Sequence, residues 1–124
     1  MTKELFNDRV HALMAKVLDL TSERHRVLAN NVANVDTPGF QRSDIRFDRE
    51  LADALRSRSP NALRKLRPTV VQSKTAAAFR NDGNNVDMDT EMGEMAKNFL
   101  LYNVNAQLIS KRLAMLRAAI SGRP

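Results

Sequence analysis

The stretch that decides the fold is residues 92–120, MGEMAKNFLLYNVNAQLISKRLAMLRAAI, near the end of the chain. Apolar and small residues recur there at alternating spacings of three and four, the heptad pattern of a helix that packs against another helix. A second apolar stripe flanks the first, so this helix is expected to bury more than one face. The seam positions are Met92, Met95, Phe99, Tyr102, Ala106, Ile109, Leu113, Leu116 and Ile120, and the flanking stripe holds Leu100, Val104, Leu108 and Met115.

The charges at the two ends of this stretch support a helix. Acidic residues from Asp87 to Glu94 crowd its first turns, and Lys111, Arg112 and Arg117 lie near its end. That order complements the helix dipole. Gly122 and Pro124 follow in the sequence expected past a helix end.

The N-terminal third has the same spacing and predicts a second long helix over residues 6–34. Thr2 could cap its start. Asp36-Thr37-Pro38-Gly39 combines turn-forming residues with a proline that biases Thr37 away from helix, so the helix should end before it. The seam positions are Phe6, Val10, Leu13, Val17, Leu20, Arg24, Val27, Asn31 and Asn34.

Length and composition limit the class of protein. A chain of 124 residues supports one small domain, and a 5% aromatic fraction with no tryptophan suits helix packing better than a β-sandwich. The chain has no cysteine, which excludes disulfides and Cys-ligated zinc. No apolar run reaches the roughly 20 residues of a membrane span. The charged N-terminal residues predict no cleaved secretory signal.

The middle of the chain is different in kind. The whole net charge of +6 arises in residues 41–80, since both ends are charge-balanced. We expect residues 1–40 and 81–124 to form one helical domain and residues 41–80 to be an irregular, flexible, basic insert. Within it, Asp48–Arg58 could form a short helix with Asp48 as N-cap, interrupted at Ser59-Pro60-Asn61. Thr69–Gln72 resembles a short strand, which Ala76–Phe79 could pair with or not.

No constellation of residues predicts catalysis, a metal or a cofactor. His11 and His25 lie about 21 Å apart along one helix, too far to share a metal. Ser22 beside His25 is weak evidence for a nucleophile and base. The acidic run Asp82–Asp89 lacks the ligand order of a calcium loop, and helix capping explains it more simply. We therefore expect a protein that is not an enzyme and has no small-molecule substrate.

The basic middle raises an alternative, a small nucleic-acid-binding coiled coil. Against it, acidic residues interleave with the arginines from Asp44 to Asp53, and only Phe40 and Phe47 could stack on bases. A solvated or protein-facing segment is the better interpretation.

The most specific local feature is residues 28–40, LANNVANVDTPGF. Three asparagines occur late in an apolar-periodic helix, although asparagine is a poor helix former. Asn31 and Asn34 fall on seam positions, where a polar residue can fix register and partner choice at some cost in stability.

This stretch resembles the N-terminal signature of the bacterial flagellar rod and hook family. The resemblance covers about residues 10–47 and 84–121. The chain is too short for the hook or distal rod types, and the start of its C-terminal helix, residues 84–92, is similar to one of the two short proximal rod types. The matching signature residues are Ala29, Asn30, Asn31, Val32, Ala33, Asn34, Thr37, Pro38, Gly39 and Phe40.

The resemblance implies a mostly α fold in which the two long helices pair as a hairpin and form the inner tube of a helical filament. It implies a structural subunit of the proximal rod, which joins the membrane ring and export gate to the distal rod and is needed for motility. Its partners would be copies of itself, other rod proteins, and ring or export-gate adaptor proteins at the rod base. The family is exported by the flagellar type III apparatus and assembles in the periplasm. The asparagine motif and the turn after it would set where the first helix leaves the tube.

Overall fold

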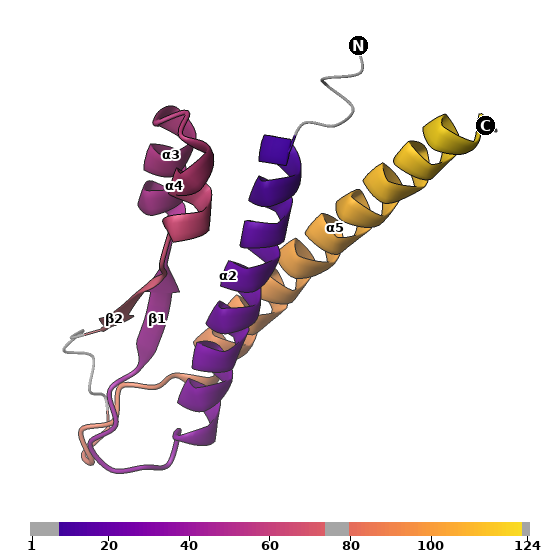
Figure 1. Ribbon diagram of the computed structural model, residues 1–124. Helices are drawn as coiled ribbons and strands as arrows, with labels where there is room; N and C mark the ends of the chain where they lie inside the picture. Colours follow the sequence, from indigo (N-terminus) through magenta and orange to yellow (C-terminus); the bar gives the residue numbers. More distant parts are fainter. Residues whose placement is uncertain (1–7, 74–79, 123–124) are drawn as a thin grey trace.

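The computed structural model describes residues 8–73 and 80–122. The expectations for Thr2, Phe6, Ala76–Phe79 and Pro124 lie outside these ranges. The elements follow in the order α2, β1, α3, α4, β2 and α5, and Figure 1 shows α2 between the small central elements on one side and α5 on the other. No helix within the described ranges is both long enough and apolar enough to cross a membrane.

The two long predicted helices are confirmed. α2 spans Asp8–Ala33 and α5 spans Met88–Ser121. Asp87 caps α5 by accepting a hydrogen bond from the Asp89 N–H at 3.1 Å, as the capping interpretation of the acidic run expects. α5 ends at Gly122, whose φ of 65° is the left-handed conformation that favours glycine past a helix end.

The middle of the chain holds the predicted short helix and strand, and a second helix and strand that were not predicted. β1 (Ser43–Arg46) pairs antiparallel with β2 (Thr69–Gln72), with Ile45 opposite Val70. α3 covers Asp48–Arg56 and α4 covers Pro60–Lys65.

Two local expectations for this segment are corrected. Asp48 is the first residue of α3, and the N-cap position belongs to Phe47 with no side-chain cap. Pro60 does more than interrupt a helix, because it begins α4. Proline suits the first turn of a helix, where its missing N–H is not needed.

The apolar core lies between α2 and the middle segment. α2 contributes the fully buried Leu20, and the partly buried Leu13 and Val27 pack around the cluster. The middle segment is too poor in large apolar residues to form a core by itself, so it completes one against α2. The buried members of the cluster are Leu20, Ile45, Phe47, Ala54, Leu63 and Leu66.

Shortening a core residue of the middle segment tests this arrangement. Leu63 on α4 is 2% exposed, whereas Leu55 on α3 is 37% exposed. We expect Leu63→Ala to lower the free energy of unfolding by about 2–4 kcal/mol, because it opens a cavity in the shared core. Leu55→Ala is the matched control and should cost well under about 1.5 kcal/mol. Urea denaturation followed by circular dichroism measures both, and equal losses would contradict the placement of the core.

Candidate functional site

A buried asparagine joins α2, β1 and α5. The side chain of Asn31 is fully buried near the end of α2. Its Nδ2 donates to the Ser43 carbonyl at 2.7 Å and to Oε2 of Glu91 at 3.1 Å, and its Oδ1 accepts from the Ser43 N–H at 3.0 Å. Because a buried amide costs free energy unless it is hydrogen-bonded, this set of partners is what allows asparagine here. One side chain thus holds the first strand and the start of α5 to α2.

Charged residues surround this amide. The fully buried Glu91 also pairs through Oε1 with Nε of Arg42. Arg24 binds both carboxylate oxygens of Asp44, at 2.9 and 3.0 Å, and donates to Oε2 of Glu94 at 2.8 Å. Arg24 therefore ties β1 and α5 to the middle of α2. We call Arg24, Asn31, Arg42, Asp44, Glu91 and Glu94 the polar clamp.

The ion pairs of the polar clamp shift the pKa values of its members. Burial alone would raise the pKa of Asp44, but the hydrogen bonds and charge of Arg24 outweigh it and hold that pKa below its ordinary value. Hydrogen bonds from Arg24, then from Lys97, lower the pKa of Glu94. The Asp44 hydrogen bond raises the pKa of Arg24, and the Glu91 hydrogen bond raises that of Arg42. The arginines stay charged at every physiological pH.

A second asparagine closes the end of α2. Asn84 is buried, and its Nδ2 lies 2.8–3.0 Å from the carbonyl oxygens of Asn34, Val35 and Thr37. These carbonyls follow the last turn of α2 and have no helical partner of their own. The turn is fixed from the other side by Gly39, whose φ is 73° and whose N–H donates to the Asp82 carbonyl at 2.8 Å.

The signature residues thus divide into two groups. Asn31 is buried in the polar clamp, and Asn34 donates through Nδ2 to the Asn30 carbonyl at 2.8 Å and accepts at Oδ1 from the Thr37 hydroxyl at 3.1 Å. Phe40 is half-buried. Val32 is also half-buried. The others are exposed and form no part of the core, so a role for them in assembly stays a prediction. The exposed signature residues are Ala29, Asn30, Ala33, Thr37, Pro38 and Gly39.

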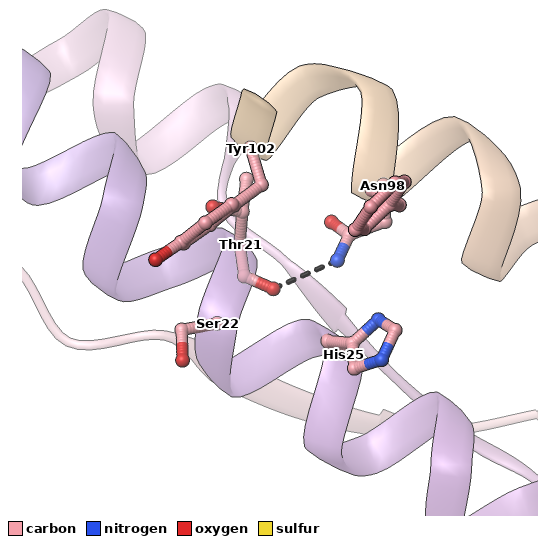
Figure 2. A pocket seen from close by; sticks show the side chains of 6 residues that line it. Thr21, Ser22, His25, Asn98 and Tyr102 are labelled. Carbon is pink, nitrogen blue, oxygen red and sulfur yellow. Dashed lines mark hydrogen bonds between the residues drawn. The ribbon is translucent and has the colours of Figure 1, made fainter. Parts of the chain in front are cut away.

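The contact between the two long helices is made largely by polar groups. Asn98 on α5 donates through Nδ2 to the Thr21 carbonyl of α2 at 2.7 Å (Figure 2). One heptad further along, Asn105 donates to the Met14 carbonyl at 2.6 Å. Glu91, one heptad earlier, bonds Asn31 in the polar clamp. Residues 91, 98 and 105 therefore form one buried polar row that faces α2 in antiparallel order.

Beside Asn98 the two helices enclose an open hollow of about 240 Å³. Figure 2 shows Thr21, Ser22 and His25 on α2 facing Asn98 and Tyr102 on α5. Phe99 also lines this hollow. Ser22 and His25 share the hollow, but no hydrogen bond between them is among those of the described residues. His11 lies elsewhere, in a hollow between α2 and α4.

The predicted seams differ in how far the single chain covers them. On α2, Leu20 is buried and the rest are half-buried, namely Val10, Leu13, Val17 and Val27. On α5 the half-buried positions are Met95, Ala106, Ile109 and Leu116. The other α5 seam residues, Met92, Phe99, Tyr102, Leu113 and Ile120, are exposed. Packing at these exposed positions stays a prediction about the assembled protein.

Sequence reasoning missed the residues that contact α2 most closely, which are Glu91, Asn98 and Asn105. A search for apolar periodicity passes over polar residues, although these three recur at intervals of seven. Asn98 and Asn105 could have revealed this contact, because asparagine is a poor helix former and its presence inside a long helix indicates a specific role.

Comparison with known proteins gives the class first. The family described as "Flagella basal body rod protein" matches residues 18–41, which contain the end of α2 and the turn after it. The chain is 34% identical to flagellar basal body rod protein FlgB of Escherichia coli (strain K12) over 124 residues, covering 86% of this chain and 90% of the relative. It is 34% identical over 109 residues to FlgB of Borrelia hermsii (74% and 81% covered) and 33% identical over 115 residues to FlgB of Aquifex aeolicus (strain VF5) (90% and 92% covered). The chain belongs to the FlgB family of flagellar rod proteins, and the resemblance inferred from the signature is confirmed.

Two neighbouring asparagines allow a matched test of the polar clamp. Asn31→Ala removes the partners of the Ser43 backbone and of Glu91, and should cost about 2 kcal/mol or more in the free energy of unfolding. Asn30 is exposed on the same helix, so Asn30→Ala should change stability by no more than about 0.5 kcal/mol. Urea denaturation of both variants measures the difference. A loss of similar size for the two would show that the clamp does not hold the fold.

Acid should weaken the polar clamp. The pKa values of Asp44 and Glu94 are lower in the folded chain than their ordinary 3.8 and 4.5, so the unfolded chain binds protons first. Their stabilisation is fully present above about pH 5 and is lost as the pH falls through the lowered folded values. Urea denaturation from pH 7 to 3 should show this decline. In Arg24→Gln the decline should be shallower, and an unchanged slope would contradict the assignment.

Proposed function

We propose that the chain is a structural subunit of the proximal rod of the flagellar basal body, without catalytic activity, and that α5 carries its main assembly surface. The observation that supports this most is the apolar side of α5 that the chain itself leaves uncovered. Phe99 is 56% exposed and Ile120 is 76% exposed. Large apolar side chains left exposed along the whole length of a helix mark an interaction site. The other exposed apolar residues of α5 are Met88, Met92, Leu100, Leu101, Tyr102, Val104, Leu108, Leu113 and Met115.

The charged residues of the site support a structural role. The carboxylates of Asp44 and Glu94 are both bound by Arg24, and Glu91 is bound by Arg42 and Asn31. A catalytic acid or base needs a proton-transfer partner and a pKa near the working pH. In the clamp, Arg24 instead holds the pKa values of Asp44 and Glu94 below their ordinary values. This is the arrangement of a junction that fixes helix positions.

We infer that the rod core consists of residues 1–40 and 81–124, with residues 41–80 as an arm on its outer side. The arrangement of Figure 1 supports this, since α3 and α4 lie on one side of α2 and the C-terminal half of α5 diverges on the other. The same core cluster that joins the arm to α2 also fixes its direction. In an assembled tube, the arm would point away from the axis that α2 and α5 surround.

The partners we propose are copies of this chain, other rod proteins, and ring or export-gate adaptor proteins at the rod base. The relatives are named as basal body rod proteins, which supports the first two. The net positive charge of the arm supports the third, because residues 41–80 carry ten basic and four acidic side chains. We propose that assembly takes place in the periplasm. The nucleic-acid alternative has no support among the relatives.

Charges placed on the exposed side of α5 test the proposal. Phe99→Asp and Leu113→Asp should leave the fold of the single chain nearly unchanged, within about 1 kcal/mol, because both side chains are exposed there. Each should block incorporation into rods and abolish motility, because assembly would bury an unpaired charge. Swimming assays and blots of isolated basal bodies measure this.

Gln107→Asp is the matched control, because Gln107 is exposed on the same helix and already polar. It should still swim. Normal motility of a strain carrying Phe99→Asp would refute an assembly surface on this side of α5.

A further inference from the structure

Seven of the eleven exposed large apolar residues of α5 lie in two rows on opposite flanks of the helix, and Met88, Leu100, Tyr102 and Val104 lie outside these rows. Relative to Asn98, which faces α2, Phe99 lies about 100° to one side and Leu101 about 60° to the other. Both rows repeat every seven residues. We name them row A, which is Met92, Phe99, Ala106, Leu113 and Ile120, and row B, which is Leu101, Leu108 and Met115. Of these only Ala106 is not exposed.

Row A lies beside the hollow of Figure 2, and one polar atom in this hollow lacks a hydrogen-bond donor. Asn98 is 2% exposed and uses its Nδ2 on the Thr21 carbonyl. Its Oδ1 is buried and has no hydrogen-bond partner among the residues that the structure describes. A buried acceptor without a partner costs free energy, so a donor that reached it through the open side of the hollow would stabilise a contact made there. Phe99 and Tyr102 supply an apolar wall next to it.

We propose that row A and this hollow receive row B of a second copy of the chain. The proposal rests on the assembly function argued above and names the two faces that meet. Both rows have the same heptad spacing, so side chains of one can interdigitate with the other when neighbouring α5 helices run parallel. Every copy then uses row A toward one neighbour and row B toward the other.

A contact between row A and row B covers the apolar residues on both flanks of α5, which a symmetric dimer does not do. A two-fold contact would place row A against row A and leave both copies of row B in water. A contact between unlike faces covers both rows and can repeat around a ring or helix. The incoming copy must also bring a hydrogen-bond donor to Asn98. Lys97 is exposed, lies four residues before Leu101 on the row B side of α5, and is our candidate for this donor.

Cysteine crosslinking tests the pairing directly, because the natural chain has no cysteine. Phe99→Cys marks row A, Leu101→Cys and Leu108→Cys mark row B, and all three sites are exposed, so folding should not suffer. Basal bodies isolated from strains that carry these variants are treated with a short bifunctional maleimide. A chain with Phe99→Cys and a row B cysteine together should give a ladder of crosslinked multimers. Each single variant should stay monomeric.

The double variant Phe99→Cys with Gln107→Cys is the control, since Gln107 lies on the face opposite Asn98. The row A–row B variants should give about tenfold more crosslinked product than it does, because adjacent cysteines react at a high effective concentration. Dimers from Phe99→Cys alone would overturn the proposal in favour of a symmetric contact. Double variants that are present in rods, yet form no ladder with either row B position, would overturn it while leaving the assembly function intact. Absence of the unmodified chain from basal bodies would instead refute the assembly function itself.

Discussion

The structure depends on the requirement that the buried amide of Asn31 be hydrogen-bonded at both its nitrogen and its oxygen. Asn31 meets it by bonding the backbone of β1 and the carboxylate of Glu91. Glu91 is itself tolerable only because Arg42 neutralises it. Removing one member leaves another buried and unpaired, which costs more than the bond contributes. The position of β1, and with it the arm and the start of α5, is therefore set by this one cluster.

The chain reverses the usual distribution of polar and apolar residues in a helix pair. Asn98 and Asn105 occupy the face of α5 that meets α2, while Phe99 and Leu108 face outward. Side chain to backbone hydrogen bonds contribute modestly, about 1 kcal/mol each. Burial of the apolar rows contributes the larger favourable free energy, and this contribution is made only when another surface covers the rows. Much of the stabilisation available to α5 is thus reserved for assembly.

The sequence predicted the elements that repeat or that carry strong local signals. The heptad spacing predicted both long helices. Asp36-Thr37-Pro38-Gly39 predicted the end of the first helix, and Asp87 and Gly122 predicted the caps of the second. β1 was missed, because Ser43–Arg46 alternates weakly and gains its order from Asn31 and β2. The polar clamp was missed because its members lie up to 70 residues apart. Asn31 alone was marked in advance, since an asparagine on an apolar seam calls for partners.

The polar row also explains how a helix with large apolar residues on several sides packs one particular face on α2. If residues 98 and 105 were apolar, several faces of α5 could pack on α2 with similar free energy, and the chain could not reserve one for its neighbours. An asparagine is costly on any face that lacks an acceptor, so it selects the face. It does not select the register, because helix carbonyls recur at every turn. The register requires a unique pair, which Glu91 and Asn31 provide. Face and register are therefore fixed by different residues of one heptad row, and the rest of the α5 surface remains available for contacts between copies.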